Sequence, residues 1–333
     1  MKALEPAANA AVALDALLDS LVDPAVRDLA WLIFSPDLLC AQPPAGMLAI
    51  PFESAGEASA TVAWLLALDQ DAHDLHQSLS ASHVTRLGRY AECLLGYFLR
   101  HGPAARLVAA NVALRRAGRT LGECDFLVET ASGKRLHWEL AVKCYLHAGG
   151  ARASMADYVG PNLQDRFDLK FTHLLDHQLP LSAREEFASL GHSGPWDAQM
   201  FVKGWLFYRW RDAADAAAAA APVPAEIHPA HARGWWLARG DLSRFAAGHA
   251  EAWAVLPRLA WLAPRQRVPV DHSTGAAVRL LDSGALAEQL AQQSGPTMVA
   301  AFARDGGACW FECSRGFVVP NDWPERALAY AGQ

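Results

Sequence analysis

Hydrophobic positions recur at helical spacing in three stretches of the first hundred residues. Leucine and valine return every three to four positions over residues 9–34, and Pro24 interrupts this pattern. Asp23, directly before Pro24, is a helix-start signal because aspartate caps free amides and proline suits a first helical turn. Two further helices are predicted over residues 56–79 and 85–101.

After residue 103 the pattern changes to short apolar runs that are rich in strand-forming residues. Three strands are predicted, at RLVAANVAL (106–114), CDFLVET (124–130) and RLHWELAVKCYL (135–146). A helix over 162–178, with Asn162 as its cap, and a strand over 199–210 follow. The central order is therefore helix, three strands, helix, strand.

The last third of the chain begins with a segment of low complexity. Residues 212–233 are rich in alanine and then proline, which predicts a linker or a surface loop. Helices are predicted near 241–254 and 282–293. A hairpin is predicted to pair TMVAAFA (297–303) with CWFECSRGFVV (309–319).

These elements predict an α/β protein with four segments. They are an acidic helical N-terminal region (1–84), a central core (85–211), the Ala/Pro-rich linker or loop (212–233) and a C-terminal α+β region (234–333).

Composition and charge narrow the class of protein. Of the 333 residues 52% are hydrophobic and 19% charged, which indicates a globular chain with a large core. The net charge is −6, but residues 1–84 hold eleven acidic and two basic side chains, so the rest of the chain is net positive. This balance excludes a protein held to nucleic acid by its overall charge and leaves room for a local basic groove.

Cysteine usage and hydropathy favour a cytoplasmic protein without a membrane segment. The six cysteines include no Cys-x-x-Cys pair, and no apolar run reaches the roughly 18 residues of a membrane helix. Acidic residues follow the N-terminus too closely for a signal peptide.

Two predicted strands bring acidic residues together. In a strand, residues two apart share a face, so Glu123 and Asp125 point one way, and Glu139, Ala141 and Lys143 share a face of the next strand. The connection between the strands is short enough for a hairpin, so Asp125 and Glu139 are expected to lie side by side. Two such carboxylates repel unless a cation or a proton lies between them, and Mg²⁺ or Mn²⁺ suits oxygen ligands.

At these residues the sequence resembles a known superfamily. The string GECDFLVE (122–129) followed by LHWELAVK (136–143) looks like the PD-(D/E)XK nucleases, whose common core is helix, three strands, helix, strand. The strings TLGECDFLV, LHWELAVKCYL and GPNLQDRFDLK are similar to an uncharacterised bacterial family of unknown function placed in that superfamily. The resemblance covers about residues 80–210 and implies a restriction-endonuclease-like core with helical N-terminal and α+β C-terminal additions.

The resemblance also implies roles for particular residues. Asp125 and Glu139 match the metal-binding acids, and Glu92 on the preceding helix matches an acid that some members use. Lys143 is the candidate for the catalytic lysine. The implied activity is Mg²⁺- or Mn²⁺-dependent hydrolysis of phosphodiesters in DNA or RNA.

One departure from the superfamily pattern bears on catalysis. The lysine usually stands two residues after the glutamate, where this chain has Ala141, and Lys143 stands four after. Lys170, on the following helix, is a second candidate for the catalytic lysine. A non-catalytic alternative therefore stays open, in which a nuclease-like fold binds nucleic acid or a partner protein without cutting it. In a third interpretation the acids make only structural ion pairs.

Arginines around the predicted site suggest nucleic acid as the partner. Seven lie within residues 86–119, where Glu92 is the only acid. Arg166 and Lys170 are four apart on a predicted helix, which would hold two positive charges together for a phosphate. The candidate nucleic-acid-binding residues are Arg86, Arg89, Arg115, Arg116 and Arg166; solvated surface arginines are the alternative. The sequence leaves the oligomeric state open.

Overall fold

The computed structural model describes residues 7–149, 154–192, 194–211, 222–264, 268–269, 279–304 and 309–333. The chain divides into two compact units. The first comprises Met1–Lys143, Lys170–Gly204 and Glu226–His231, and the second comprises Cys144–Leu169, Trp205–Ala225 and Ala232–Gln333. Both units contain helices and strands, so the protein is a mixed α/β protein.

The N-terminal hydrophobic pattern forms two helices, α1 (Ala7–Ser20) and α2 (Pro24–Phe34). Pro24 opens α2, and the Asp23 side chain accepts hydrogen bonds from two amides of its first turn. The predicted start signal is therefore confirmed.

The single helix predicted over 56–79 is wrong, because the chain forms α3 (Ala55–Gln70) and α4 (His73–Ala81) there. Asp71 leaves the helical conformation, with φ −148°, and its Oδ1 accepts a hydrogen bond from the His73 amide. The next helix, α5 (Leu87–His101), lies where the sequence predicts it.

The first unit contains a predominantly antiparallel set of strands. Strands β2 (Ala105–Arg116) and β3 (Arg119–Thr130) form a hairpin, and β3 pairs with β4 (Arg135–His147) from Phe126↔Trp138 to Glu129↔Arg135. Next in order comes β6 (Asp197–Arg209), and the short β1 (Met47–Leu48) runs parallel to it. Gly204 allows β4 and β6 to approach, because its φ is +136° and an added Cβ would overlap the Lys143 carbonyl oxygen.

The helix predicted over 162–178 is shorter and less regular than expected. Leu163 has φ +54°, so no right-handed helix passes through it, and α6 begins at Phe167 (Phe167–His173). It continues as a π-helical turn (Leu174–Gln178) and a 3₁₀ turn (Leu179–Ala183), followed by α7 (Glu185–Ala188).

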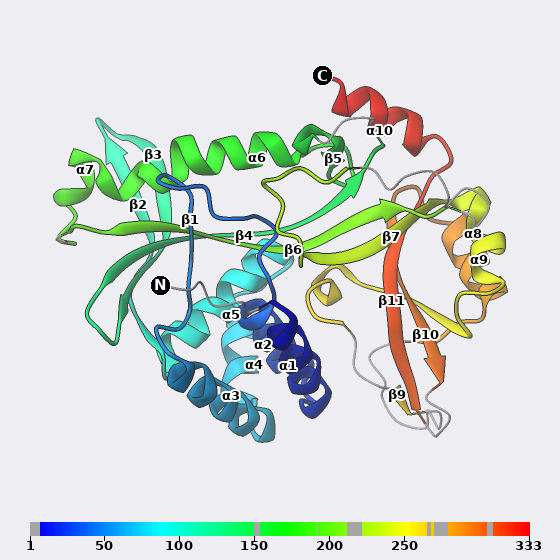
Figure 1. Ribbon diagram of the computed structural model, residues 1–333, viewed down its shortest axis with the longest axis horizontal. Helices are drawn as coiled ribbons and strands as arrows, with labels where there is room; N and C mark the ends of the chain where they lie inside the picture. Colours follow the sequence, from blue (N-terminus) through cyan, green and yellow to red (C-terminus); the bar gives the residue numbers. More distant parts are fainter. Residues whose placement is uncertain are drawn as a thin grey trace. The chain divides into compact units, whose positions relative to one another are not determined.

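Helical segments of the first unit cover both faces of the β2–β3 hairpin (Figure 1). On one face the Phe126 ring lies close to Gly96 of α5. On the other face the Leu181 side chain, in the 3₁₀ turn, packs against Gly122 with no room for a Cβ between them. Strand β3, which carries Asp125, is therefore held between these layers.

In the second unit, parallel and antiparallel strands meet. Strand β7 (Ala232–Ala238) runs parallel to the end of β6 and to β11 (Cys309–Val319). Strand β10 (Thr297–Arg304) pairs antiparallel with β11, which confirms the predicted hairpin, although its predicted turn at 304–307 lies mostly outside the described residues. Strand β8 (Ala252–Val255) pairs with β10.

Shorter elements complete the second unit. Strand β5 (Tyr158–Val159) pairs with the end of β4, and β9 (Val268–Pro269) pairs with β11. The 3₁₀ turns are Met155–Asp157, Arg239–Asp241 and Arg258–Ala260.

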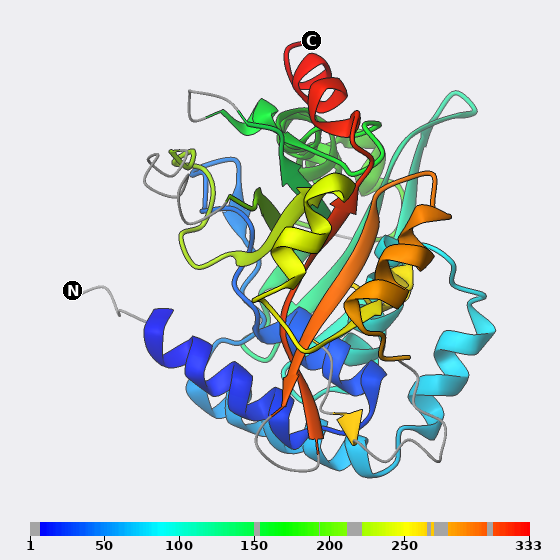
Figure 2. The same cartoon turned by 90° about the vertical axis from the view of Figure 1, so that its right-hand side faces the viewer.

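The helix predicted over 241–254 is wrong, since α8 (Leu242–Ala246) is short and the chain then enters β8. Helices α9 (Ser283–Ala291) and α10 (Trp323–Ala331) follow. Figure 2 shows α8 and α9 lying against β10 and β11. The core between them contains Trp235, Phe245, Trp253 and Leu286.

Two findings concern segments predicted from composition. Of the predicted linker, residues 212–221 lie outside the described residues and Ala232 already belongs to β7. Within the described part of the chain, no helix combines the length and apolar character needed to cross a membrane.

Candidate functional site

Asp125 and Glu139 lie together where β3 and β4 separate. The ladder between these strands ends at Phe126↔Trp138. One residue further, the Asp125 amide donates to Glu139 Oε1 at 3.3 Å, and the Leu140 amide donates to Asp125 Oδ2 at 2.9 Å. Each carboxylate thus accepts a backbone amide of the opposite strand, and the two side chains are neighbours as expected from strand alternation.

The environment of Asp125 disfavours its charged form. Burial, followed by the negative charge of Glu139, raises the pKa of Asp125 to about 8. The Leu140 amide and the Lys170 charge act in the opposite direction, and Glu92 adds to the increase. The carboxylate pair therefore retains a proton near neutral pH, or accepts a cation in its place.

Glu139 is fully buried at the centre of a hydrogen-bond network. Its Oε1 lies 2.7 Å from His137 Nε2, and its Oε2 accepts from Gln178 Nε2 at 2.6 Å. Gln178 Oε1 in turn accepts from Lys170 Nζ at 2.6 Å. Lys170 is therefore linked to Glu139 through a single amide side chain.

His137 and Cys124 adjoin this network from the same two strands. His137 is fully buried, and its Nδ1 lies 3.0 Å from Ser182 Oγ. The ligand atoms of Cys124, His137 and Glu139 all lie within 4.8 Å of one another. Burial, with the charges of Glu139 and Asp125 adding to it, raises the pKa of the Cys124 thiol well above its usual value.

Glu92 and Lys143, the other predicted acid and lysine, lie on α5 and on β4. The Glu92 carboxylate accepts a hydrogen bond from Arg89 Nη1 at 2.6 Å, while its charge still acts on Asp125. Lys143 lies four residues beyond Glu139 in β4, half-buried, with its backbone against Gly204. Lys170, the second candidate lysine, is linked to Glu139 by hydrogen bonds through Gln178.

Four of the five candidate arginines are exposed in the first unit, namely Arg86, Arg89, Arg115 and Arg116. Arg166 belongs to the second unit, where it makes two hydrogen bonds to the Asp168 carboxylate, at 2.7 and 2.8 Å. The predicted helical pair of Arg166 and Lys170 is wrong, because Arg166 precedes α6 and forms a β-bridge with Val159.

Sequence reasoning missed His137, Gln178 and Ser182. The strand alternation that pointed to Glu139 also places His137, two residues earlier, on the same face. Gln178 ends the π-helical turn and Ser182 lies in the 3₁₀ turn. Apolar periodicity does not register such a change of helical pitch, so nothing in the sequence pointed to these two residues.

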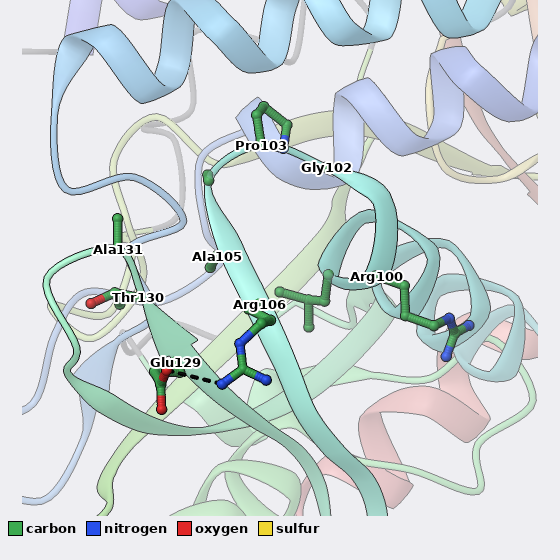
Figure 3. Close-up of a pocket in the computed structure, with 10 residues that line it drawn as sticks. Arg100, Gly102, Pro103, Ala105, Arg106, Glu129, Thr130 and Ala131 are labelled. Atoms are coloured by element: carbon green, nitrogen blue, oxygen red, sulfur yellow. Dashed lines mark hydrogen bonds and ion pairs between the residues drawn. The ribbon is translucent and has the colours of Figure 1, made fainter.

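A separate pocket of about 370 Å³ lies between the end of α5, the start of β2 and the end of β3. Figure 3 shows Arg106 turned towards Glu129, to which its Nη2 donates at 2.9 Å, while Arg100 points away from this pair. Neither Asp125 nor Glu139 lines this pocket. It is therefore distinct from the carboxylate site.

The fold and the site together define a mixed α/β protein with a carboxylate pair in its sheet, of which Glu139 is fully buried and Asp125 half-buried. The chain belongs to the family described as DUF1853, a domain of unknown function, whose model matches residues 27–319. The match spans both units and includes every residue of the carboxylate network. No curated protein and no solved structure shows significant similarity to the chain.

Proposed function

We propose that this protein is a Mg²⁺- or Mn²⁺-dependent phosphodiesterase that acts on DNA or RNA, with a PD-(D/E)XK-like core. The observation that carries the proposal is the paired placement of Asp125 and Glu139 at the point where β3 and β4 separate. The chain order α5, β2, β3, β4, α6, β6, interrupted by short elements, supports it, since it follows the core order of that superfamily.

The residues present fit a divalent cation. Two carboxylates of opposite strands converge, and their mutual repulsion is part of what raises the pKa of Asp125. Asp125 and Glu139 would hold the ion, and Glu139 Oε2 would become a ligand when the Gln178 amide releases it. When bound, the ion supplies polarisation of the scissile phosphate and a lower pKa for the attacking water.

Lys170 supplies the positive charge in this proposal. Gln178 holds its Nζ towards the carboxylates, so the ammonium can offset the negative charge that develops on the phosphate. The absence of a lysine at position 141 then removes no function, because the ammonium group comes from Lys170 on α6 and not from β4.

Exposed arginines would bind the nucleic-acid backbone. Arg115 and Arg116 lie at the end of β2 beside the hairpin turn, and Arg86 and Arg89 lie at the start of α5. All four belong to the same unit as the carboxylates. Guanidinium groups bind phosphates in a bidentate manner, and such contacts do not require a particular base sequence.

Titration calorimetry of Mn²⁺ and Mg²⁺ tests the site, with nuclease assays on DNA and RNA beside it. We expect stoichiometric Mn²⁺ binding that is lost in Asp125→Asn and in Glu139→Gln. Glu129→Gln is the matched control, because this acid lies in the same strand and pairs with Arg106 at the surface. Absence of Mn²⁺ binding and of cleavage in the wild type would overturn the proposal.

A second candidate is a nuclease-like fold that binds nucleic acid or a partner protein without cutting. The observation that favours it is that both Glu139 oxygens already accept hydrogen bonds from protein groups in a fully buried position. Mn²⁺ binding without cleavage of any DNA or RNA substrate would support this candidate over the enzyme.

A further inference from the structure

We propose that Cys124, His137 and Glu139 form a binding centre for a transition metal ion of the Zn²⁺ type. Their ligand atoms, a thiol sulfur, an imidazole nitrogen and a carboxylate oxygen, lie within 4.8 Å of one another. All three side chains are buried; His137 and Glu139 are two residues apart on β4, and Cys124 lies next to Asp125 on β3. This inference does not depend on phosphodiester hydrolysis and so goes beyond the proposed function.

His137 and Glu139 each have a second polar contact, on the atom that would not bind the metal, as metal ligands usually do. Ser182 Oγ lies against His137 Nδ1, which leaves Nε2 facing the centre. The Gln178 amide holds Glu139 Oε2, which leaves Oε1 facing the same point. Such second contacts fix the imidazole tautomer and the carboxylate orientation at metal sites.

The distances allow an ion to enter with small movements. His137 Nε2 and Glu139 Oε1 are 2.7 Å apart and form a hydrogen bond in the metal-free protein. Ligands about 2.1 Å from a tetrahedral ion lie roughly 3.4 Å apart, so this pair must open by about 0.7 Å. The Cys124 sulfur, which lies within 4.8 Å of the other two ligand atoms, must come to about 3.6 Å from each of them. The ion would replace the proton of this hydrogen bond and the thiol proton of Cys124.

The mixture of ligands selects the kind of metal. Thiolate and imidazole favour Zn²⁺ and its neighbours over Mg²⁺, which prefers oxygen ligands and octahedral geometry. Three protein ligands would leave one position for water, as in catalytic zinc sites. Glu139 is common to this centre and to the proposed Mg²⁺ site, so an ion held by Cys124 and His137 would compete with Mg²⁺ for that carboxylate.

Cobalt titration of the full-length, metal-free protein tests the inference, because Co²⁺ replaces Zn²⁺ in such sites and its thiolate complexes absorb in the ultraviolet. We expect a thiolate-to-Co²⁺ charge-transfer band that saturates at one ion per chain and disappears when Zn²⁺ is added. Cys124→Ser should abolish this band. His137→Gln should weaken Co²⁺ binding at least tenfold, in line with the loss of one ligand.

Control variants and a second measurement make the outcomes distinct. Cys144→Ser removes a second buried cysteine, which lies in β4, and should leave the band unchanged. The adjacent His173 and His177 rings on the surface bring no thiolate, so ion binding there produces no such band. Circular dichroism checks that Cys124→Ser folds, and Cys124→Ala replaces it if it does not.

Absence of the charge-transfer band in the wild type, or its persistence in a folded Cys124 variant, would overturn the inference. Mg²⁺-dependent cleavage is measured on the same wild-type preparation. Cleavage without the Co²⁺ band rejects the transition-metal centre alone. The band without cleavage supports the centre and counts against the phosphodiesterase.

Discussion

Asp125 and Glu139 each accept a hydrogen bond from a backbone amide of the strand that carries the other acid. The two carboxylates thereby take over bonds that a continued β-ladder would have supplied. This arrangement satisfies both amides and keeps two carboxyl groups close together, with Glu139 fully buried and Asp125 half-buried. It gives the acids a structural role even when no metal is bound.

The pH dependence of stability should change when one of these acids is neutralised. Because the folded-state pKa of Asp125 is raised from 3.8 to about 8, the folded protein binds this proton more tightly than the unfolded chain. The stability of the wild type should therefore fall as pH rises through this interval. Asp125→Asn removes the titration, while its side-chain oxygen can still accept the Leu140 amide.

From pH 5 to pH 8, the free energy of unfolding of Asp125→Asn should increase relative to that of the wild type by on the order of 2 kcal/mol. Urea denaturation at both pH values, in the presence of a chelator, measures this difference. Glu129→Gln, on the same strand, should show no comparable gain. Equal destabilisation of Asp125→Asn at both pH values would instead indicate that the charged carboxylate makes a favourable structural pair.

Lys170 should matter more for catalysis than Lys143. The Lys170 ammonium is held by Gln178 next to Glu139, so Lys170→Met should lower kcat by about 100-fold with little change in Mn²⁺ affinity. Lys143→Met, on β4, is the matched variant and should reduce kcat less than tenfold. Single-turnover cleavage at saturating Mn²⁺ provides the comparison, and a larger loss with Lys143→Met would assign the role to the strand lysine.

Much of the central framework could be predicted because its signals are local. The amphipathic pattern of α5, the β-rich runs of β2 to β4 and the apolar run of β6 each lie within a few residues of the predicted bounds. The break between α3 and α4 was missed, since it depends on how Asp71 bonds its own neighbouring backbone. The helix predicted over 241–254 is too long, because the apolar residues of β8 follow those of α8 at a spacing that also fits a helix.

Strand alternation predicts the pairing of Asp125 with Glu139, but not the rest of the site. Alternation and a short connection placed Asp125 beside Glu139, but they gave no indication that Glu139 is bonded on both sides. The position of Gln178 depends on the π-helical turn, and that turn depends on how the helix packs on β3. Such tertiary determinants are not encoded in a local pattern.

In the second unit, Arg315 should be among the most important residues for stability. It is 1% exposed and makes two hydrogen bonds to the Glu312 carboxylate, at 2.6 and 3.0 Å. It also donates to backbone carbonyls, including that of Ala263. Arg315→Met would leave the buried Glu312 without this partner and should cost about 3–5 kcal/mol.

Arg326→Ala provides the surface counterpart, because its pair with Asp322 is exposed and should contribute less than about 1 kcal/mol. Chemical denaturation of both variants measures the contrast. If Glu312→Gln restores the stability of Arg315→Met, the loss comes from the unpaired charge. Failure of that rescue would assign the loss to the carbonyl contacts of the guanidinium.

The arginines beside the β2–β3 turn should contribute to nucleic-acid affinity through phosphate contacts. Arg115 and Arg116 are exposed, and Arg116 Nη1 lies 3.6 Å from Glu186 Oε1 in a long, surface ion pair. Each phosphate contact that is lost should reduce the slope of log affinity against log salt by about 0.9 for double-stranded DNA. The double variant Arg115→Ala/Arg116→Ala should therefore bind more weakly and with a flatter salt dependence, on all sequences alike.

Fluorescence anisotropy with labelled duplexes at several salt concentrations measures both quantities, with Ca²⁺ replacing Mg²⁺ to suppress cleavage. Arg326→Ala, an exposed arginine of α10, should leave the slope unchanged. A weaker affinity with an unaltered slope would mean that the two arginines act on the hairpin's structure and not on phosphates. An unchanged affinity would mean that Arg115 and Arg116 do not bind phosphates, and Arg86 and Arg89 at the start of α5 are then the next residues to replace.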